Sequence, residues 1–386
     1  MRICGIICEF NPFHNGHKYL LQRARELSGC DKIVCIMSGT FTQRGDICIM
    51  DKFVRARHAV LCGADAVLEL PAAFSVAPAE IFARGAIKIL NSIPEVITLA
   101  FGCENAQADF MSTASLLNEE NQEFKLILSQ KLADGVSYIK SYATAFESCG
   151  GQKNLLAQPN NILGVEYAKA ILKLKSKIKI LPIERIGSRY GDSTLKPNFS
   201  SASALRKKPQ DPLIKDNIPD CVYADFEDFS DKNNRFEYLL RFKLLQSAPE
   251  TLQKIYGCTE GLENRLMNLA SLPFDELIEN ATARRYSSSR IKRILCANLL
   301  DLYKDDCEDY LQSPLYLKPL AVKNEGADET LSALAKSEYP LVLKQRDLNN
   351  LSEPSKRSFE RDVDAYKIWN FIANRPQNGF DYVKFI

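Results

Sequence analysis

A chain of 386 residues, with 46% hydrophobic and 25% charged residues, is long enough for two or three domains and has the composition of an ordinary globular protein. No run of about 18 uncharged apolar residues argues for a membrane span, and the apolar stretch 2–8 is too short for a signal peptide. The net charge of +2 does not by itself indicate nucleic-acid binding, although a local basic patch is compatible with it. We therefore expect a cytoplasmic protein.

Apolar and amphipathic segments alternate over residues 1–208. Strands are predicted at residues 2–8, 32–37, 66–70, 96–101 and 178–186. Helices are predicted at residues 17–28, 51–62, 78–91 and 162–176, and the polar stretch 106–148 also has a helical pattern. Strands that alternate with helices indicate an α/β, Rossmann-like domain built on a parallel, doubly wound sheet.

The rest of the chain has a different character. Residues 209–235 are rich in proline and aspartate and show little periodicity, so we place a domain boundary there. Helical patterns then dominate, and residues 314–345 are typical of a small strand–helix–strand element. We expect three parts: a catalytic domain at 1–208, a mainly helical domain at 209–310 and a small mixed α/β element at 311–386.

Three loops directly follow predicted strands, at residues 9–16, 38–46 and 102–105. Ligands of doubly wound sheets bind beyond the carboxyl ends of the strands, near the point where the strand order reverses. We therefore expect these three loops to converge on one crevice.

The loop after the first strand contains two of the three histidines of the chain, in the segment His14-Asn15-Gly16-His17. A helix that opens at His17 presents unpaired N–H groups and the positive end of its dipole, which suit a polyphosphate. Imidazole donors stabilise charge that builds on phosphoryl oxygens, and Gly16 lets the backbone approach a base or a ribose. The third histidine, His58, is expected in the core or behind the site.

Twelve cysteines are scattered along the chain, and no two of them form a Cys-x-x-Cys pair. A zinc ribbon is therefore not expected, and we interpret the cysteines as small buried residues in a reducing compartment. Because the sequence shows no dedicated cage of carboxylates, no protein-bound metal site is predicted.

The segment 11–17 resembles the His/Thr-x-Gly-His signature of the nucleotidylyltransferase superfamily. Residues 199–206 resemble its partner motif, Ile-Ser-Ser-Thr-x-x-Arg, although Ala202 and Ser203 depart from the usual residues. The chain further resembles one family, the bacterial tRNA(Met) cytidine acetate ligases, at residues 39–45, 51–55, 63–71, 101–104, 159–164 and 284–286. The resemblance covers nearly the whole chain and is densest over residues 1–206.

This resemblance implies a two-step reaction. ATP and acetate form acetyl-adenylate and pyrophosphate, and N4 of the wobble cytidine of elongator tRNA(Met) then attacks to give N4-acetylcytidine and AMP. The implied enzyme is an ATP-dependent ligase with magnesium bound through the nucleotide phosphates, and neither a membrane nor an obligatory protein partner is implied. The ATP site of the family carries over onto Ile7, Cys8, Glu9, Phe10, Asn11, Pro12, Phe13, His14, Asn15, Gly16, His17, Lys18, Tyr19, Leu20, Gly102, Asn160 and Arg185.

A carboxylate that attacks the α-phosphate needs its negative charge screened, and the candidate catalytic residues for this are His14, His17, Lys52 and Arg206. Other interpretations remain open for several residues. Arg185 also fits an ordinary charge at a strand end, and Asn160-Asn161 also fits a helix cap, with either asparagine as the ATP contact. Asp51, Lys52 and Arg55 also fit a surface ion pair.

A basic segment later in the chain is the candidate RNA-binding site. Five cations surround one tyrosine over residues 284–293, mostly at helical spacing. Phosphate contacts from the cations and stacking by the ring fit RNA, while a solvated helix face is the other interpretation. The candidate RNA-binding residues are Arg284, Arg285, Tyr286, Arg290, Lys292 and Arg293.

Two other functions fit parts of the sequence. A small-molecule adenylyltransferase that makes a dinucleotide cofactor would need only the N-terminal half, and it leaves the segment 284–293 without a purpose. A non-catalytic, nucleotide-responsive RNA-binding protein would need neither His14 nor His17. A class I aminoacyl-tRNA synthetase is disfavoured because the sequence has no Lys-Met-Ser-Lys-Ser-like loop.

Overall fold

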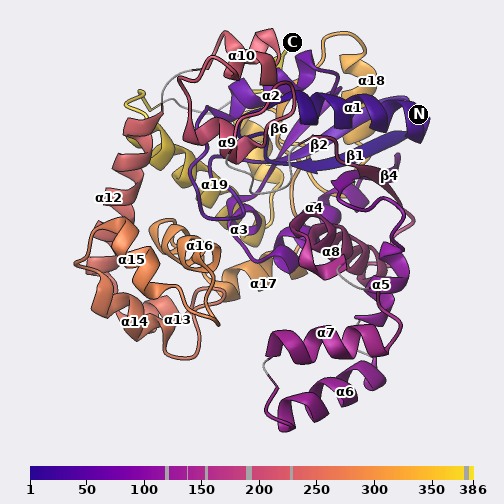
Figure 1. Ribbon diagram of the computed structural model, residues 1–386. Helices are drawn as coiled ribbons and strands as arrows, with labels where there is room; N and C mark the ends of the chain where they lie inside the picture. Colours follow the sequence, from indigo (N-terminus) through magenta and orange to yellow (C-terminus); the bar gives the residue numbers. More distant parts are fainter. Residues whose placement is uncertain (118–120, 137, 153–154, 188–193, 227–228, 378–381) are drawn as a thin grey trace.

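The structure is a computed structural model, and it describes seven stretches of the chain (Figure 1). These are residues 1–117, 121–136, 138–152, 155–187, 194–226, 229–377 and 382–386.

A seven-stranded sheet forms the centre of the molecule, with the strand order β5-β4-β1-β2-β3-β6-β7. The five strands predicted from the sequence are all present and parallel: β1 (Ile3–Cys8), β2 (Lys32–Ser38), β3 (Ala66–Leu70), β4 (Val96–Cys103) and β5 (Lys179–Glu184). Both faces of β2 and β3 are buried, which explains why these strands are continuous apolar runs rather than alternating ones. The predicted α/β fold with a mostly parallel sheet is confirmed.

Helices cover both faces of this sheet (Figure 1). α1 (Asn15–Ser28) and α2 (Lys52–Leu61) lie on one face, and α3 (Ala72–Ser75), α4 (Ala79–Asn91) and α8 (Pro159–Lys173) lie on the other. α1 begins two residues earlier than predicted because the side chain of His14 caps its first turn. α8 begins three residues earlier than predicted because Pro159 suits its first position.

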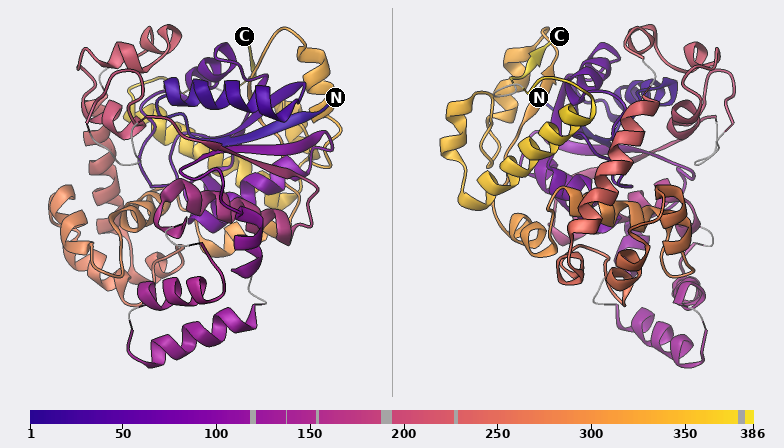
Figure 2. Two further views of the ribbon diagram at one scale, coloured as in Figure 1. Left: turned by 45° about the vertical axis from the view of Figure 1, so that its right-hand side comes forward. Right: turned by 90° about the vertical axis from the view of Figure 1, so that its left-hand side faces the viewer.

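Three further helices follow β4. α5 (Phe110–Leu116) packs on α8, while α6 (Gln122–Ala133) and α7 (Tyr138–Ser148) form a hairpin that projects away from the body (Figures 1 and 2). These helices confirm the predicted helical stretch 106–148. A short 3-10 helix, Leu155–Ala157, leads from this hairpin into α8.

A group of helices gathers beside the sheet domain, and both views show it on the side opposite the N-terminus (Figures 1 and 2). The chain reaches it through α9 (Ala202–Lys207), α10 (Ile214–Asn217) and α11 (Asp220–Tyr223). The group itself comprises α12 (Ser230–Gln246), α13 (Pro249–Gln253), α14 (Leu262–Leu269), α15 (Phe274–Ala281) and α16 (Ser288–Leu299), and α17 (Lys304–Gln312) then returns to α3 and α4. The expected helical character of the region after residue 208 is confirmed.

The C-terminal segment departs from the predicted strand–helix–strand element. β6 (Pro319–Val322) and α18 (Ala327–Leu334) are present, but an isolated bridge between Leu317 and Leu341 replaces the second strand. Pro340, next to that bridge, has no N–H to donate to a ladder. The long helix α19 (Glu353–Ile372), which follows a 3-10 turn at Gln345–Asn350, was not predicted from the sequence.

β6 pairs antiparallel with β3, and β7 (Lys384–Phe385) pairs parallel with β6, so residues beyond 311 extend the N-terminal sheet. α19 is fixed to the loop after β2 by two buried hydrogen bonds. The Trp369 indole donates to the carbonyl of Cys48 over 2.8 Å, and the Tyr366 hydroxyl donates to the Asp51 carboxylate over 2.6 Å. The division of the chain into three domains stays a prediction, but its third part shares one sheet with its first.

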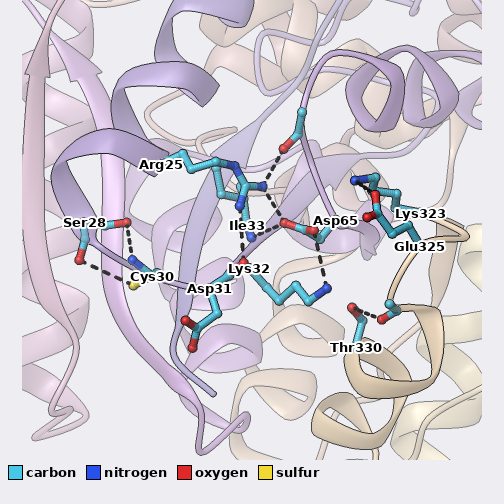
Figure 3. Close-up of polar contacts among 12 residues, drawn as sticks. Arg25, Ser28, Cys30, Asp31, Lys32, Ile33, Asp65, Lys323, Glu325 and Thr330 are labelled. Carbon is cyan, nitrogen blue, oxygen red and sulfur yellow. Dashed lines mark hydrogen bonds and ion pairs between the residues drawn. The ribbon is translucent and has the colours of Figure 1, made fainter.

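Asp65 joins three elements at the amino ends of the strands, as Figure 3 shows. Its carboxylate accepts the backbone N–H of Ile33 over 2.7 Å and the Arg25 guanidinium over 2.6 Å, and the Lys32 ammonium lies 3.9 Å away. These contacts hold α1, β2 and β3 together at the amino ends of the strands. They do not involve the loops at the carboxyl ends, where the crevice is predicted.

All twelve cysteines are free thiols, eight of them buried and four half-buried, which agrees with their interpretation as small core residues. Over the described part of the chain, no helix combines the length and apolar character needed to cross a lipid bilayer.

Candidate nucleotide site

A cavity of about 320 Å³ opens beyond the carboxyl ends of β1 and β4. The strand order reverses between these two strands, so the cavity lies where ligands of doubly wound sheets bind. All three loops predicted to converge contribute residues to it. Twelve predicted residues line it: Ile7, Cys8, Glu9, Phe10, Asn11, His14, His17, Leu20, Gly102, Asn160, Arg185 and Arg206.

His14 and His17 stand together at the start of α1, with ring centroids 3.7 Å apart and an interplanar angle of 23°. The Nδ1 atom of His14 accepts the backbone N–H of Gly16 over 3.0 Å, and Nδ1 of His17 accepts the backbone N–H of His14 over 3.3 Å. Since each Nδ1 is an acceptor, the proton of each neutral ring sits on Nε2. The capping contacts therefore leave two Nε2–H donors in the wall of the cavity.

Both imidazoles are held in the neutral form. Burial, reinforced by Arg185 and Arg206, lowers the pKa of His14 to about 3. Burial and the neighbouring His14 ring lower the pKa of His17 well below its usual value. The pair therefore offers fixed donors to an anion without adding positive charge of its own.

Two arginines supply positive charge beside the histidines. Arg206, in the last turn of α9, donates from Nη1 to the carbonyl of Asn11 over 2.5 Å, which holds its guanidinium against the first loop. Arg185 follows β5, and its side chain lies along Gly102, where an added Cβ would stand 3.3 Å from the arginine Cγ. Two guanidinium groups and two imidazoles on one wall form a site suited to a polyphosphate.

Asn160 and Asn161 play different parts at the start of α8. Asn161 is buried, and its side-chain oxygen accepts the backbone N–H of Glu104 over 3.0 Å. Asn160 lines the cavity and donates its amide to the Glu104 carboxylate over 2.6 Å, so its own oxygen is left to accept a hydrogen bond. Of the two candidates, Asn160 is the one placed for a nucleotide contact. Glu104, which holds both asparagines, is a residue whose role the sequence analysis missed.

The loop after β2 forms the facing wall with Thr42, Gln43, Arg44 and Asp46. The position of this loop at the crevice was predicted from the strand that precedes it, and its individual residues were not predicted as contacts.

Arg55, a fully buried residue of α2, fixes the two loops relative to each other. Its guanidinium donates to the carbonyl of Glu9 over 2.6 Å, of Ser38 over 3.2 Å and of Met50 over 3.2 Å, and also to that of Gly39. The interpretation of Asp51, Lys52 and Arg55 as a surface ion pair is wrong, since all three are buried.

The floor of the cavity is apolar. Phe82, Phe101, Ile162, Leu163 and Tyr167 contribute to it from α4, β4 and α8. These residues were not predicted as site residues, because hydrophobic periodicity does not distinguish a cavity lining from a packed interior. An apolar floor beside an anion-binding wall suits a nucleotide.

Some residues of the predicted segment 7–20 lie outside this cavity. Gly16 and Tyr19 line a small adjoining hollow, Phe13 is in the core, and Lys18 is exposed. Asn15 donates its amide to the carbonyls of Asn198 and Asp216, and Pro12 is buried outside the lining. Some residues of the segment 7–20 thus line the cavity, and others hold the loop in its position.

The position of Lys52 does not fit its predicted role as a phosphate screen. Its ammonium lies 2.9 Å from both carboxylate oxygens of Glu69 and 4.5 Å from the ring centroid of Tyr366. Lys52 is buried and does not line the cavity. Its buried charge is balanced by β3 rather than directed at a ligand. His58, also buried, is 2.7 Å from the Asp225 carboxylate, in agreement with its expected place behind the site.

Two of the six candidate RNA-binding residues hold the helical region together. Tyr286 is buried and donates its hydroxyl to the carbonyl of Glu260 over 3.0 Å. Arg290 donates to the carbonyl of Gly257 over 2.7 Å and lies 5.1 Å from the Tyr286 ring. Arg284 and Arg285 are exposed and remain available for a partner.

The other two cations reach the wall of the cavity. The Lys292 ammonium lies 3.3 Å from the Asp46 carboxylate, and Arg293 donates to the carbonyl of Gln43 over 3.3 Å. An added Cβ on Gly45, whose φ is +78°, would stand 2.5 Å from the backbone of both residues. α16 therefore packs directly on the loop Thr42–Asp46, which places the basic segment beside the nucleotide cavity.

Comparison with known proteins agrees with this geometry. Residues 1–381 match the HIGH Nucleotidyl Transferase family. The chain is 33% identical to the tRNA(Met) cytidine acetate ligase of Acetivibrio thermocellus over 97% of this chain and 96% of that one. It is 38% identical to the protein of the same name from Clostridium novyi over 89% and 90%.

Solved structures of Thermotoga maritima TmcAL are also similar. At 28% identity and with complete coverage of both chains, the apo form aligns with a TM-score of 0.89 and the form bound with alpha-thio ATP with a TM-score of 0.86. A relative with this fold thus binds an ATP analogue.

Proposed function

The chain belongs to the HIGH Nucleotidyl Transferase family and, within it, to the tRNA(Met) cytidine acetate ligases, and on this premise we propose that it activates acetate with ATP and acetylates N4 of the wobble cytidine of elongator tRNA(Met). The intermediate is acetyl-adenylate, and the products are pyrophosphate, AMP and N4-acetylcytidine. The reaction takes place in the cytoplasm, where its tRNA substrate is found.

The observation that carries the proposal is the neutral histidine pair between two arginines. An acetate oxygen that attacks the α-phosphate meets a negatively charged centre, and charge builds on the phosphoryl oxygens in the transition state. Two Nε2–H donors on one side, with Arg185 and Arg206 beside them, stabilise that charge without having to reorganise. Asn160 and the apolar floor suit the adenine ring.

Magnesium would enter with the nucleotide, bound to its phosphates. Among the described residues, no group of three or more histidine, cysteine, aspartate or glutamate side chains could hold a metal ion on its own. Its contribution would be to neutralise phosphate charge, while the protein residues orient the reacting groups.

The position of α16 supports an RNA acceptor rather than a mononucleotide. The exposed Arg284 and Arg285 lie just before this helix, and its Lys292 and Arg293 contact the loop that lines the cavity. An RNA whose phosphates contact Arg284 and Arg285 would therefore be bound close to the helix that packs on the cavity loop.

The test is direct. The protein is incubated with ATP, acetate and unmodified elongator tRNA(Met), and the digested RNA is examined for N4-acetylcytidine by mass spectrometry. We expect one acetyl group per tRNA and its loss when the wobble cytidine is replaced by uridine. Absence of acetylation by folded protein, together with pyrophosphate release from ATP and a mononucleotide, would instead assign the chain to the dinucleotide-forming adenylyltransferases.

A further inference from the structure

The lining of the nucleotide cavity carries groups of both charges. His14, His17, Arg185 and Arg206 suit phosphate, whereas the loops after β1 and β2 add two carboxylates, Glu9 and Asp46. A carboxylate does not bind a phosphate anion, so these two groups call for a different role.

The Glu9 carboxylate is held by one of its two oxygens. Oε1 accepts the backbone N–H of Gln43 over 2.7 Å, which fixes the group against the wall. No other hydrogen bond or ion pair reaches this carboxylate from the residues that the structure describes. The second oxygen, Oε2, therefore remains available to a ligand in the cavity.

The Asp46 carboxylate already has a partner within the protein. Its carboxylate lies 3.3 Å from the Lys292 ammonium of α16, so its charge is balanced by the helical region. Its backbone N–H donates to the Thr42 hydroxyl over 3.1 Å, which closes the loop. Of the two carboxylates, Glu9 is the one placed to act on a substrate.

The proposed reaction needs a proton acceptor in its second step. The N4 amine of cytidine is conjugated with the ring and becomes an effective nucleophile only as it loses a proton. Neither histidine can take that proton, because Nδ1 of each already accepts a backbone N–H and Nε2 carries the ring proton. Carboxylates, by contrast, are the side chains that accept hydrogen bonds from cytosine N4.

We propose that Glu9 is the general base for acetyl transfer and accepts the N4 proton of the target cytidine through Oε2. This inference rests on the proposed function. In the step, the N4–C bond to the acetyl carbon forms and the bond from that carbon to the AMP phosphate oxygen breaks. AMP leaves with the electron pair of the broken bond, and the proton from N4 moves to the Glu9 carboxylate.

The surroundings of Glu9 fit this role. Burial raises the pKa of Glu9, which strengthens it as a base. The charged and titratable groups around it are Arg44, Asp46, Arg206, Tyr167, Cys8 and Cys48. The backbone N–H of Gln43 and the charges of Arg206 and Arg44 act against burial and lower the pKa of the carboxylate.

Gln43 joins the base to the candidate RNA-binding helix. Its N–H donates to Glu9, and its carbonyl accepts from Arg293 of α16 over 3.3 Å. Glu9 is thus linked to α16 through the single residue Gln43. A cytidine bound beside α16 would have this carboxylate as a neighbour.

The test separates the two half-reactions in the full-length protein. Acetate-dependent exchange of pyrophosphate into ATP measures formation of acetyl-adenylate, and single-turnover acetylation of unmodified tRNA(Met) measures transfer. Glu9→Gln keeps an oxygen for the Gln43 N–H and removes the base, so transfer should slow by about 10²- to 10⁴-fold, far more than exchange. Asp46→Asn removes the other carboxylate of the cavity lining and should slow transfer much less.

A pH profile provides a second readout. The wild-type transfer rate should rise with pH until Glu9 is ionised, and this rise should vanish in Glu9→Gln. Equal loss of exchange and transfer in Glu9→Gln, or transfer at the wild-type rate, overturns the role of Glu9. Absence of acetylation by the wild type would overturn the proposed function instead.

Discussion

Arg293 of α16 donates a hydrogen bond to the carbonyl of Gln43, a residue 250 positions earlier in the chain. The arginine is half-buried, and burial together with Arg290 and Arg44 lowers its pKa to about 10. This contact joins the helical region to the wall of the nucleotide cavity. A residue that the sequence assigned to RNA therefore helps to shape the ATP site.

Replacing Arg293 should for this reason affect ATP more than RNA. Arg293→Met removes the donor while keeping an apolar stem, so the loop Thr42–Asp46 should lose its fixed position. We expect the KM for ATP in pyrophosphate exchange to rise about 10-fold, the effect of losing about 1.4 kcal/mol of binding. The matched control is Arg285→Met, at an exposed residue, which should weaken tRNA binding and reduce its salt dependence while the KM for ATP stays the same. The reverse pattern would contradict the assignment of Arg293 to the loop.

Substitution of His17 should affect the adenylation step. His17→Ala removes one Nε2–H donor and the side-chain acceptor for the His14 N–H, and we expect acetate-dependent pyrophosphate exchange to fall by about 10²- to 10³-fold. Substitution of the buried His58 by Gln, away from the cavity, is the control and should leave the exchange rate within a few-fold of the wild type. Comparable losses in both variants would count against a direct role of His17.

The same geometry predicts the pH profile of adenylation. Burial lowers the pKa of His14 to about 3 and lowers that of His17 as well, so both rings stay neutral as the pH falls through the ordinary histidine value of 6.5. We expect kcat/KM for ATP to show no inflection near that value. A loss of activity with an apparent pKa near 6.5 that disappears in His17→Ala would show that the pair titrates normally.

Lys52 should matter for stability. Lys52→Met leaves the Glu69 carboxylate buried beside Tyr366 without its cation, and breaking a buried pair in this way costs about 3–5 kcal/mol. The measurement is urea denaturation, and the matched variant is the double substitution Lys52→Met with Glu69→Leu, which should recover much of the loss. If Lys52→Met unfolds like the wild type but fails in pyrophosphate exchange, a catalytic role for Lys52 is restored.

Asp362 predicts how stability depends on pH. Burial and the nearby Glu69 carboxylate raise the pKa of Asp362 from 3.8 to about 8. The folded protein thus retains a proton that the unfolded chain releases above pH 3.8, so this carboxyl makes folding less favourable as the pH rises from about 4 to about 8. Asp362→Asn mimics the protonated form and still offers an oxygen to the N–H of Ala72.

The free energy of unfolding of Asp362→Asn, relative to the wild type, should therefore increase across that range and level off above it. Asp364→Asn, at a half-exposed position of the same helix, is the control for a changed charge on α19. A constant difference between Asp362→Asn and the wild type from pH 4 to pH 8 would show that Asp362 titrates normally.

Local patterns were sufficient for much of the fold and for one wall of the site. The strands are apolar runs bounded by turn residues, so they could be predicted from neighbouring residues. The start of α1 could be predicted in the same way, because His14 and His17 cap the helix that follows them. Gly102, Asn160 and Arg185 came from the resemblance, and all three line the cavity with the histidines.

What the sequence could not supply is the set of partners far along the chain. Lys52 looks like a phosphate ligand until Glu69 is placed beside it by β3 and Tyr366 by α19. Arg293 looks like an RNA contact until α16 is packed on the loop after β2. In each case the neighbouring residues in the sequence do not reveal the partner of the positive charge. Only the tertiary fold decides whether the charge faces a ligand or another residue of the protein.

The antiparallel pairing of β6 with β3 has a consequence for how the protein is made. Synthesis proceeds from the N-terminus, so β3 emerges from the ribosome long before Pro319–Val322 exists to cover its outer edge. During that interval the nascent sheet displays an open row of backbone donors and acceptors beside a strongly apolar strand. Truncation or fusion near the C-terminus would prolong this exposed state, and poor solubility of such variants would then come from an unfinished sheet.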